Sequence, residues 1–118
     1  MNEYALVCKF TRVDGMRLLV GVTSSKPLTG MSVLLSKIND GEPVVRVFKS
    51  AEGCDLRFTR LVDRYLEDGY EFDGQVEIPV PPLELESSHW EGRAGAREWA
   101  EEVLNPAEAV IQVWEGMD

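Results

Sequence analysis

Apolar and polar positions along the first part of the chain predict a β-hairpin. Residues 4–12 and 16–23 are both rich in strand-forming side chains, and Val13-Asp14-Gly15 separates them. An Asp-Gly pair between two such runs is a strong hairpin signal, because both residues readily adopt turn conformations.

The pattern then predicts a helix, a strand and a second helix. Apolar residues recur at three- and four-residue steps over 28–38, after a Pro27 that a first helical turn tolerates and before an Asn39-Asp40-Gly41 stop. Residues 43–48 are a short β-branched run, typical of a strand. A helix starting near Ser50 or Asp55 and stopping at Gly69 would carry the apolar stripe Phe58, Leu61, Val62, Tyr65 and Leu66.

The clearest alternation lies in residues 70–80 and predicts a strand with one buried and one solvated face. Gly74 interrupts the strand and indicates a bulge. The expected buried set is Tyr70, Phe72, Val76, Ile78 and Val80, and the expected solvated set is Glu71, Asp73, Gln75 and Glu77.

The end of the chain permits two interpretations. Pro79, Pro81 and Pro82 close the strand and begin an extended segment to about Trp90, and residues 93–104 have the pattern of a helix. Asn105-Pro106 resembles another helix start, whereas 110–114 is β-branched and strand-like, so 108–114 could be helix or strand. We favour a final strand.

These elements predict a single α+β domain over residues 1–118. It would hold a mixed, mostly antiparallel sheet of about five strands packed by two to three helices, in the order β-β-α-β-α-β-α-β. Cys8 and Cys54 are too few for a disulfide scaffold, and no apolar run is long enough for a membrane span. We expect a cytoplasmic protein with free thiols.

Motifs for common chemistry are missing from the sequence. The ten glycines form no phosphate-binding loop, and one histidine with two distant cysteines does not suit a zinc site. We expect no cofactor, no metal and no catalytic residue. The alternative is a small enzyme using His89, the one conventional base.

Charge is divided unevenly between the two halves of the chain. Residues 1–60 hold nine Lys/Arg and six Asp/Glu, whereas residues 61–118 hold three and fifteen, for a net charge of −9 overall. Such a bias indicates interaction with an oppositely charged partner, and the acidity argues against direct nucleic-acid binding. The predicted partner-binding residues are Glu71, Asp73, Glu77, Glu84, Glu86, Trp90, Glu91, Glu98, Glu101 and Glu102.

The sequence therefore predicts a non-enzymatic protein that docks on a basic protein, such as a nuclease or another nucleic-acid-handling complex. The chain length and the negative net charge fit an inhibitor of the toxin-immunity or phage anti-defence type. A self-associating structural subunit is a further alternative. A competing basic stripe, Arg57, Arg60 and Arg64, could act with Lys9, Arg12 and Arg17 on phosphates, although we expect these cations to pair internally or to be solvated.

Overall fold

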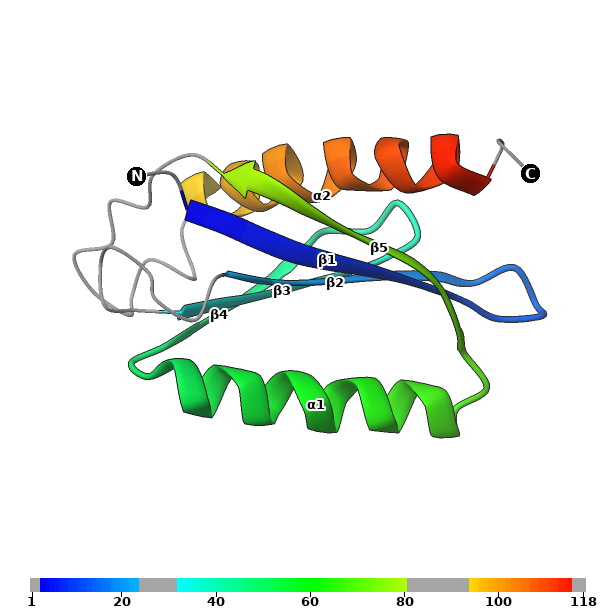
Figure 1. Ribbon diagram of the computed structural model, residues 1–118, viewed down its shortest axis with the longest axis horizontal. Helices are drawn as coiled ribbons and strands as arrows, with labels where there is room; N and C mark the ends of the chain where they lie inside the picture. Colours follow the sequence, from blue (N-terminus) through cyan, green and yellow to red (C-terminus); the bar gives the residue numbers. More distant parts are fainter. Residues whose placement is uncertain (1–2, 24–31, 81–93, 116–118) are drawn as a thin grey trace.

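A five-stranded antiparallel sheet lies between two helices in the computed structural model, which describes residues 3–23, 32–80 and 94–115 (Figure 1). The spatial order of the strands is β4-β3-β2-β1-β5. The elements are β1 (Glu3–Thr11), β2 (Arg17–Thr23), β3 (Ser32–Ile38), β4 (Val44–Phe48), α1 (Ala51–Glu67), β5 (Glu71–Val80) and α2 (Ala94–Glu115). The α+β class and the mostly antiparallel sheet of five strands are confirmed, but the order over the described residues is β-β-β-β-α-β-α, with two of the three helices that the predicted order contained.

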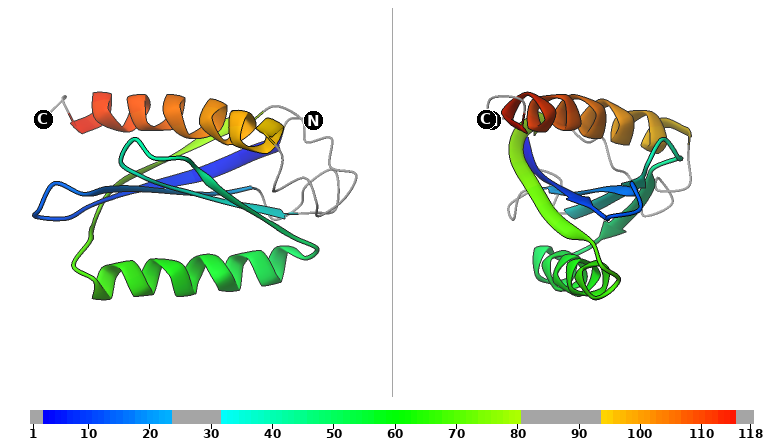
Figure 2. Two further views of the ribbon diagram at one scale, coloured as in Figure 1. Left: turned by 180° about the vertical axis from the view of Figure 1, so that it is seen from behind. Right: turned by 90° about the vertical axis from the view of Figure 1, so that its right-hand side faces the viewer.

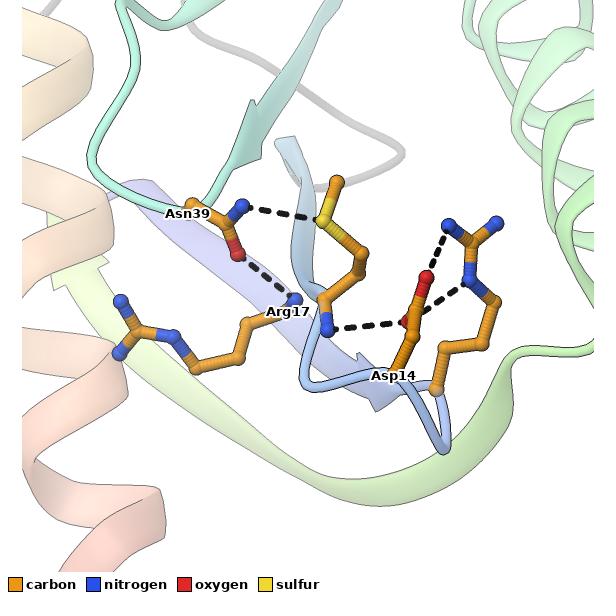
Figure 3. Close-up of polar contacts among 5 residues, drawn as sticks. Asp14, Arg17 and Asn39 are labelled. Carbon is orange, nitrogen blue, oxygen red and sulfur yellow. Dashed lines mark hydrogen bonds and ion pairs between the residues drawn. The ribbon is translucent and has the colours of Figure 1, made fainter.

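The first hairpin forms where the sequence predicted it, and Asp14 organises its turn. The Asp14 carboxylate accepts hydrogen bonds from the Met16 backbone N–H at 3.3 Å and from the Arg12 guanidinium at 2.7 and 2.9 Å (Figure 3). Gly15 has φ of +89°, which glycine adopts without strain. The β1–β2 turn is therefore fixed by its own side chains.

The helix predicted over 28–38 is wrong where the structure describes it, because residues 32–38 form strand β3. β3 pairs with both β2 and β4 and is buried on both faces through Val33, Leu34 and Leu35. A strand buried on both faces has a continuous apolar run, whose spacing also satisfies a helical pattern. Leu28 and Met31 lie outside the described residues.

The segment Asn39-Asp40-Gly41 turns β3 into β4 instead of ending a helix. Asn39 has φ of +52°, and its side-chain oxygen accepts a hydrogen bond from the Arg17 backbone N–H at 2.9 Å (Figure 3). Asparagine tolerates this left-handed conformation better than most residues. One side chain thus joins the β3–β4 turn to the first residue of β2.

Each face of the sheet has its own apolar core, covered by one helix (Figures 1 and 2). Strand residues alternate between the two, as the pleat requires. The α2-side core includes Val7, Leu19, Leu35, Trp99, Val103 and Leu104, and the α1-side core includes Cys8, Phe10, Leu18, Val20, Leu34 and Cys54. Both faces of the central strands are consequently apolar.

Helix α1 begins and ends close to the predicted signals. Ser50 is its N-cap, and the Ser50 Oγ accepts a hydrogen bond from the Gly53 backbone N–H at 3.1 Å. Gly69, with φ of +97°, follows the helix and leads the chain into β5. Phe58, Leu61, Val62 and Tyr65 pack on the sheet as expected, whereas Leu66 is 46% exposed.

Strand β5 carries the predicted bulge, which changes the assignment of its faces. Lys9 pairs with Gly74 and Phe10 pairs with Phe72, so Asp73 is the extra residue. Phe72 therefore lies on the α1 side with Phe10, whereas Val76 and Ile78 pack into the α2-side core. The prediction that Phe72, Val76 and Ile78 share one face is wrong, because a one-residue insertion reverses the alternation.

The final strand predicted at 110–114 is also wrong, since α2 continues as one helix to Glu115 with Pro106 inside it. The missing N–H of proline leaves the Glu102 carbonyl without its helical donor, and Glu102 is exposed, so water can replace that donor. A buried stripe runs through the proline at helical spacing: Trp99, Ala100, Val103, Leu104, Ala107 and Ile111. Packing of this stripe outweighs the strand preference of the Val-Ile pair.

Candidate functional site

Three of the predicted partner-binding carboxylates lie together on the exposed side of α2. Glu98, Glu101 and Glu102 are exposed, because the neighbouring residues Trp99, Ala100, Val103 and Leu104 bury the opposite side of the helix against the sheet. Among the residues that the structure describes, no cationic side chain pairs with these three carboxylates. Their charge is therefore presented to solvent.

The β5 carboxylates, which the sequence placed on one face, lie on two. Glu77 pairs with Leu6 on the α1 side, whereas Glu71 lies beyond the bulge on the α2 side. Asp73 also lies on the α2 side, where its Oδ2 is 3.8 Å from Nζ of the buried Lys9. The three do not form one surface, because the bulge separates Glu77 from the other two.

The remaining predicted residues, Glu84, Glu86, Trp90 and Glu91, lie outside the described residues, as does His89. Trp99 is buried at 8% exposure and belongs to the α2-side core. The acidic site that the described residues support is thus the exposed side of α2.

The cations of the first hairpin are occupied by internal contacts. Arg12 pairs with Asp14 and lies over the Tyr70 ring, with 5.0 Å between the guanidinium carbon and the ring centroid. Arg17 pairs with Asp40 at 3.3 Å and with Glu108 of α2 at 3.6 Å. Lys9 and Arg17 face α2, on the opposite side of the sheet from α1, so they do not join the α1 arginines in one basic site.

The α1 arginines, in contrast, are solvated. Arg57, Arg60 and Arg64 are all exposed, and none pairs with a carboxylate within residues 3–23, 32–80 and 94–115. At 100° per residue, all three fall on one flank of α1, beside the apolar stripe. Arg57 and Leu61 line a groove between this flank and strands β3 and β4.

The groove consists of two adjoining cavities, each of about 220 Å³, which share Ser36, Val44 and Tyr65. One cavity is also lined by Arg46 and Arg57, and the other by Ile38, Gly41 and Glu42. Arg46 lies opposite Leu34 in the β4–β3 pairing and therefore faces α1. Sequence reasoning missed Arg46, although its place between Val45 and Val47 indicates a face opposite to theirs.

The two thiols are buried and unsuited to nucleophilic chemistry. Burial raises the pKa of Cys8, and burial together with the nearby Asp55 carboxylate raises the pKa of Cys54 to about 12. In the described part of the chain, no cluster of His, Cys, Asp and Glu is arranged to hold a metal ion.

Comparison with known protein families, with curated proteins and with solved structures finds no match to this chain. Within the described ranges, no helix has both the length and the apolar character that a membrane crossing requires.

Proposed function

We propose that this chain is a non-catalytic, single-domain interaction protein that docks on a basic protein through its acidic C-terminal half. In this proposal, α2 supplies the centre of the docking surface, and the protein acts in the cytoplasm as an inhibitor of the toxin-immunity or phage anti-defence type. The partner would be a nuclease or another nucleic-acid-handling complex.

The observation that carries the proposal is the exposed group Glu98, Glu101 and Glu102, which has no cationic partner among the described side chains. Uncompensated charge on a rigid helix attracts an oppositely charged partner and accelerates encounter. The five glutamates and one arginine of α2 make the whole helix acidic. Two buried free thiols suit a reducing compartment, which supports the cytoplasmic assignment.

Affinity capture from the native host's lysate at low and high salt tests the proposal. The acidic variant neutralises Glu98→Gln, Glu101→Gln and Glu102→Gln together. The matched control neutralises three exposed carboxylates of α1, Asp55→Asn, Asp63→Asn and Glu67→Gln. We expect wild type and control to capture a basic protein at low salt, and the α2 variant to associate with it on the order of tenfold more slowly.

Equal capture by both triple variants would exclude α2 as the docking surface. A Glu71→Gln, Asp73→Asn and Glu77→Gln variant then tests whether the β5 carboxylates contribute instead. Loss of an enzymatic activity in His89→Ala, or a stable homo-oligomer without any captured protein, would overturn the proposal in favour of an enzyme or a structural subunit.

A further inference from the structure

The groove between α1 and the β3–β4 strands concentrates positive charge on the opposite side of the sheet from α2. Arg46 reaches it from β4, and Arg57 reaches it from α1, so two guanidinium groups from separate elements line one cavity of about 220 Å³. Both arginines are exposed, and neither pairs with a carboxylate in the part of the chain that the structure describes. Among the described residues, this cavity thus has two positive charges and no carboxylate in its lining.

Arg60 and Arg64 extend the positive charge along the same flank of α1. Glu42, which lines the adjoining cavity, is held by the Arg97 guanidinium at 3.3 Å. The Glu42 carboxylate is therefore partly neutralised from α2, and the cavity with Arg46 and Arg57 keeps its positive character.

The walls of the groove add hydrogen-bond donors and apolar surface. Ser36 and Tyr65, which carry hydroxyl groups, line both cavities. Val44, which lines both cavities, is 48% exposed, and Ile38, which lines the cavity without arginines, is 41% exposed. Pockets that combine apolar walls with a few convergent polar groups are typical of small-molecule sites.

We propose that this groove binds a small phosphomonoester, with its phosphate between Arg46 and Arg57 and a short apolar group over Val44 and Ile38. A phosphomonoester carries nearly two negative charges at neutral pH and three acceptor oxygens, which suit two guanidinium groups and neighbouring hydroxyls. A carboxylate carries one charge and satisfies one guanidinium fork. A cavity of about 150 Å³ holds a benzene-sized group, so each cavity is large enough for its part of the ligand.

The experiment titrates the full chain with phenyl phosphate, inorganic phosphate and benzoate, and follows backbone amide signals by NMR. Phenyl phosphate should saturate and shift the signals of Ser36, Val44 and Arg46. Inorganic phosphate should bind more weakly because it lacks the apolar group, and benzoate more weakly because it lacks the second charge. Arg46→Gln and Arg57→Gln should each weaken phenyl phosphate binding about tenfold, the loss expected for a charge-assisted hydrogen bond.

Arg60→Gln is the matched control, since it removes the same charge from the same helix without lining either cavity. It should change the affinity about twofold at most, because an exposed charge outside the site is screened by salt. Circular dichroism checks that all three variants keep the fold. The proposal is overturned if phenyl phosphate shifts no groove signal at millimolar concentration, if benzoate binds as well, or if Arg60→Gln weakens binding as much as Arg57→Gln.

Discussion

The β5 bulge lies against the C-terminal part of α2 at Gly74 and Ile111, which makes Gly74→Ala a sharp test of the fold. Gly74 has φ of +155°, and a Cβ placed there would lie 3.1 Å from Cγ2 of Ile111. The substitution therefore adds backbone strain and crowding at one place. Both effects depend on the bulge and on α2 remaining helical as far as Ile111.

The expected loss in the free energy of unfolding is about 2 kcal/mol. A residue held in a backbone region that favours glycine costs about 1–3 kcal/mol, and crowding by the one 3.1 Å contact adds about 1 kcal/mol, the lower end of the cost of overpacking. The lower entropy of the unfolded alanine chain offsets about 0.4–1 kcal/mol of this. For 118 residues the net loss corresponds to a fall in Tm of about 8 °C.

Urea unfolding followed by circular dichroism measures the loss, and two further variants separate its causes. Gly15→Ala tests positive φ without crowding, because Gly15 has φ of +89° and no atom within 4 Å of its added Cβ. We expect it to cost about 1 kcal/mol or less. Ile111→Leu removes the β-branch, so the double variant with Gly74→Ala should recover about 1 kcal/mol. The described contact between β5 and α2 would be refuted if Gly74→Ala left the free energy of unfolding unchanged. It would also be refuted if the double variant were no more stable than Gly74→Ala alone.

Three further substitutions or measurements test other contacts. Ser50→Ala should lower the free energy of unfolding by about 1 kcal/mol, because the Gly53 N–H loses its cap, and Ser50→Asp should preserve it. Asn39→Ala should cost about 2 kcal/mol in urea unfolding, through the lost bond from the Arg17 N–H and the positive φ, whereas Asn39→Gly should cost about half. Cys54, with its pKa raised to about 12, should resist thiol reagents in the native state at pH 8. Its contribution to stability is present below the unfolded pKa near 9 and is lost as pH rises toward 12, which pH-dependent unfolding measures.

Local signals predicted the elements whose ends are fixed by local chemistry. Asp14-Gly15, Ser50 and Gly69 each act within a few residues, and the structure uses each of them in the predicted turn, cap or stop. The bulge at Gly74 was predicted in the same way. The change of faces that the bulge causes in β5 could not be predicted in this way, because it depends on how β5 pairs with β1.

The errors arose where burial on two sides or long-range packing decides the conformation. The run Ser32–Ile38 is compatible with a helix or a doubly buried strand, and pairing with both β2 and β4 selects the strand. Near the C-terminus, Val110 and Ile111 favour a strand locally, but Ile111 continues the stripe that α2 buries. In both cases contacts outside the run itself decide, with the neighbouring strands for β3 and with the sheet for the end of α2.

The two candidate sites differ in the same way, since a local pattern predicts one of them and only packing between elements creates the other. Exposure of Glu98, Glu101 and Glu102 followed from the helical pattern around Trp99, and the structure agrees with it. The groove could not be predicted, because Arg46 and Arg57 line one cavity only when α1 packs across β4.

The exposed glutamates of α2 are unfavourable for the helix that carries them, which gives a last test of their role. Glu98 lies three residues from Glu101 and four from Glu102, so like charges face one another on one side of α2. Each such pair destabilises a helix by about 0.2–0.5 kcal/mol. Local rules are broken most often at functional sites, so this repulsion is expected of a docking surface rather than of a structural one.

Neutralising the three glutamates together should therefore raise the free energy of unfolding by about 0.5–1 kcal/mol, most clearly at low salt, where repulsion is least screened. The same variant should associate with the proposed partner on the order of tenfold more slowly, so stability and binding would change in opposite directions. Urea unfolding at low and high salt measures the first effect. A loss of more than about 1 kcal/mol would mean that these carboxylates stabilise the fold, since exposed residues without such a role change stability by about 0.5 kcal/mol or less. Their exposure would then no longer argue for a partner.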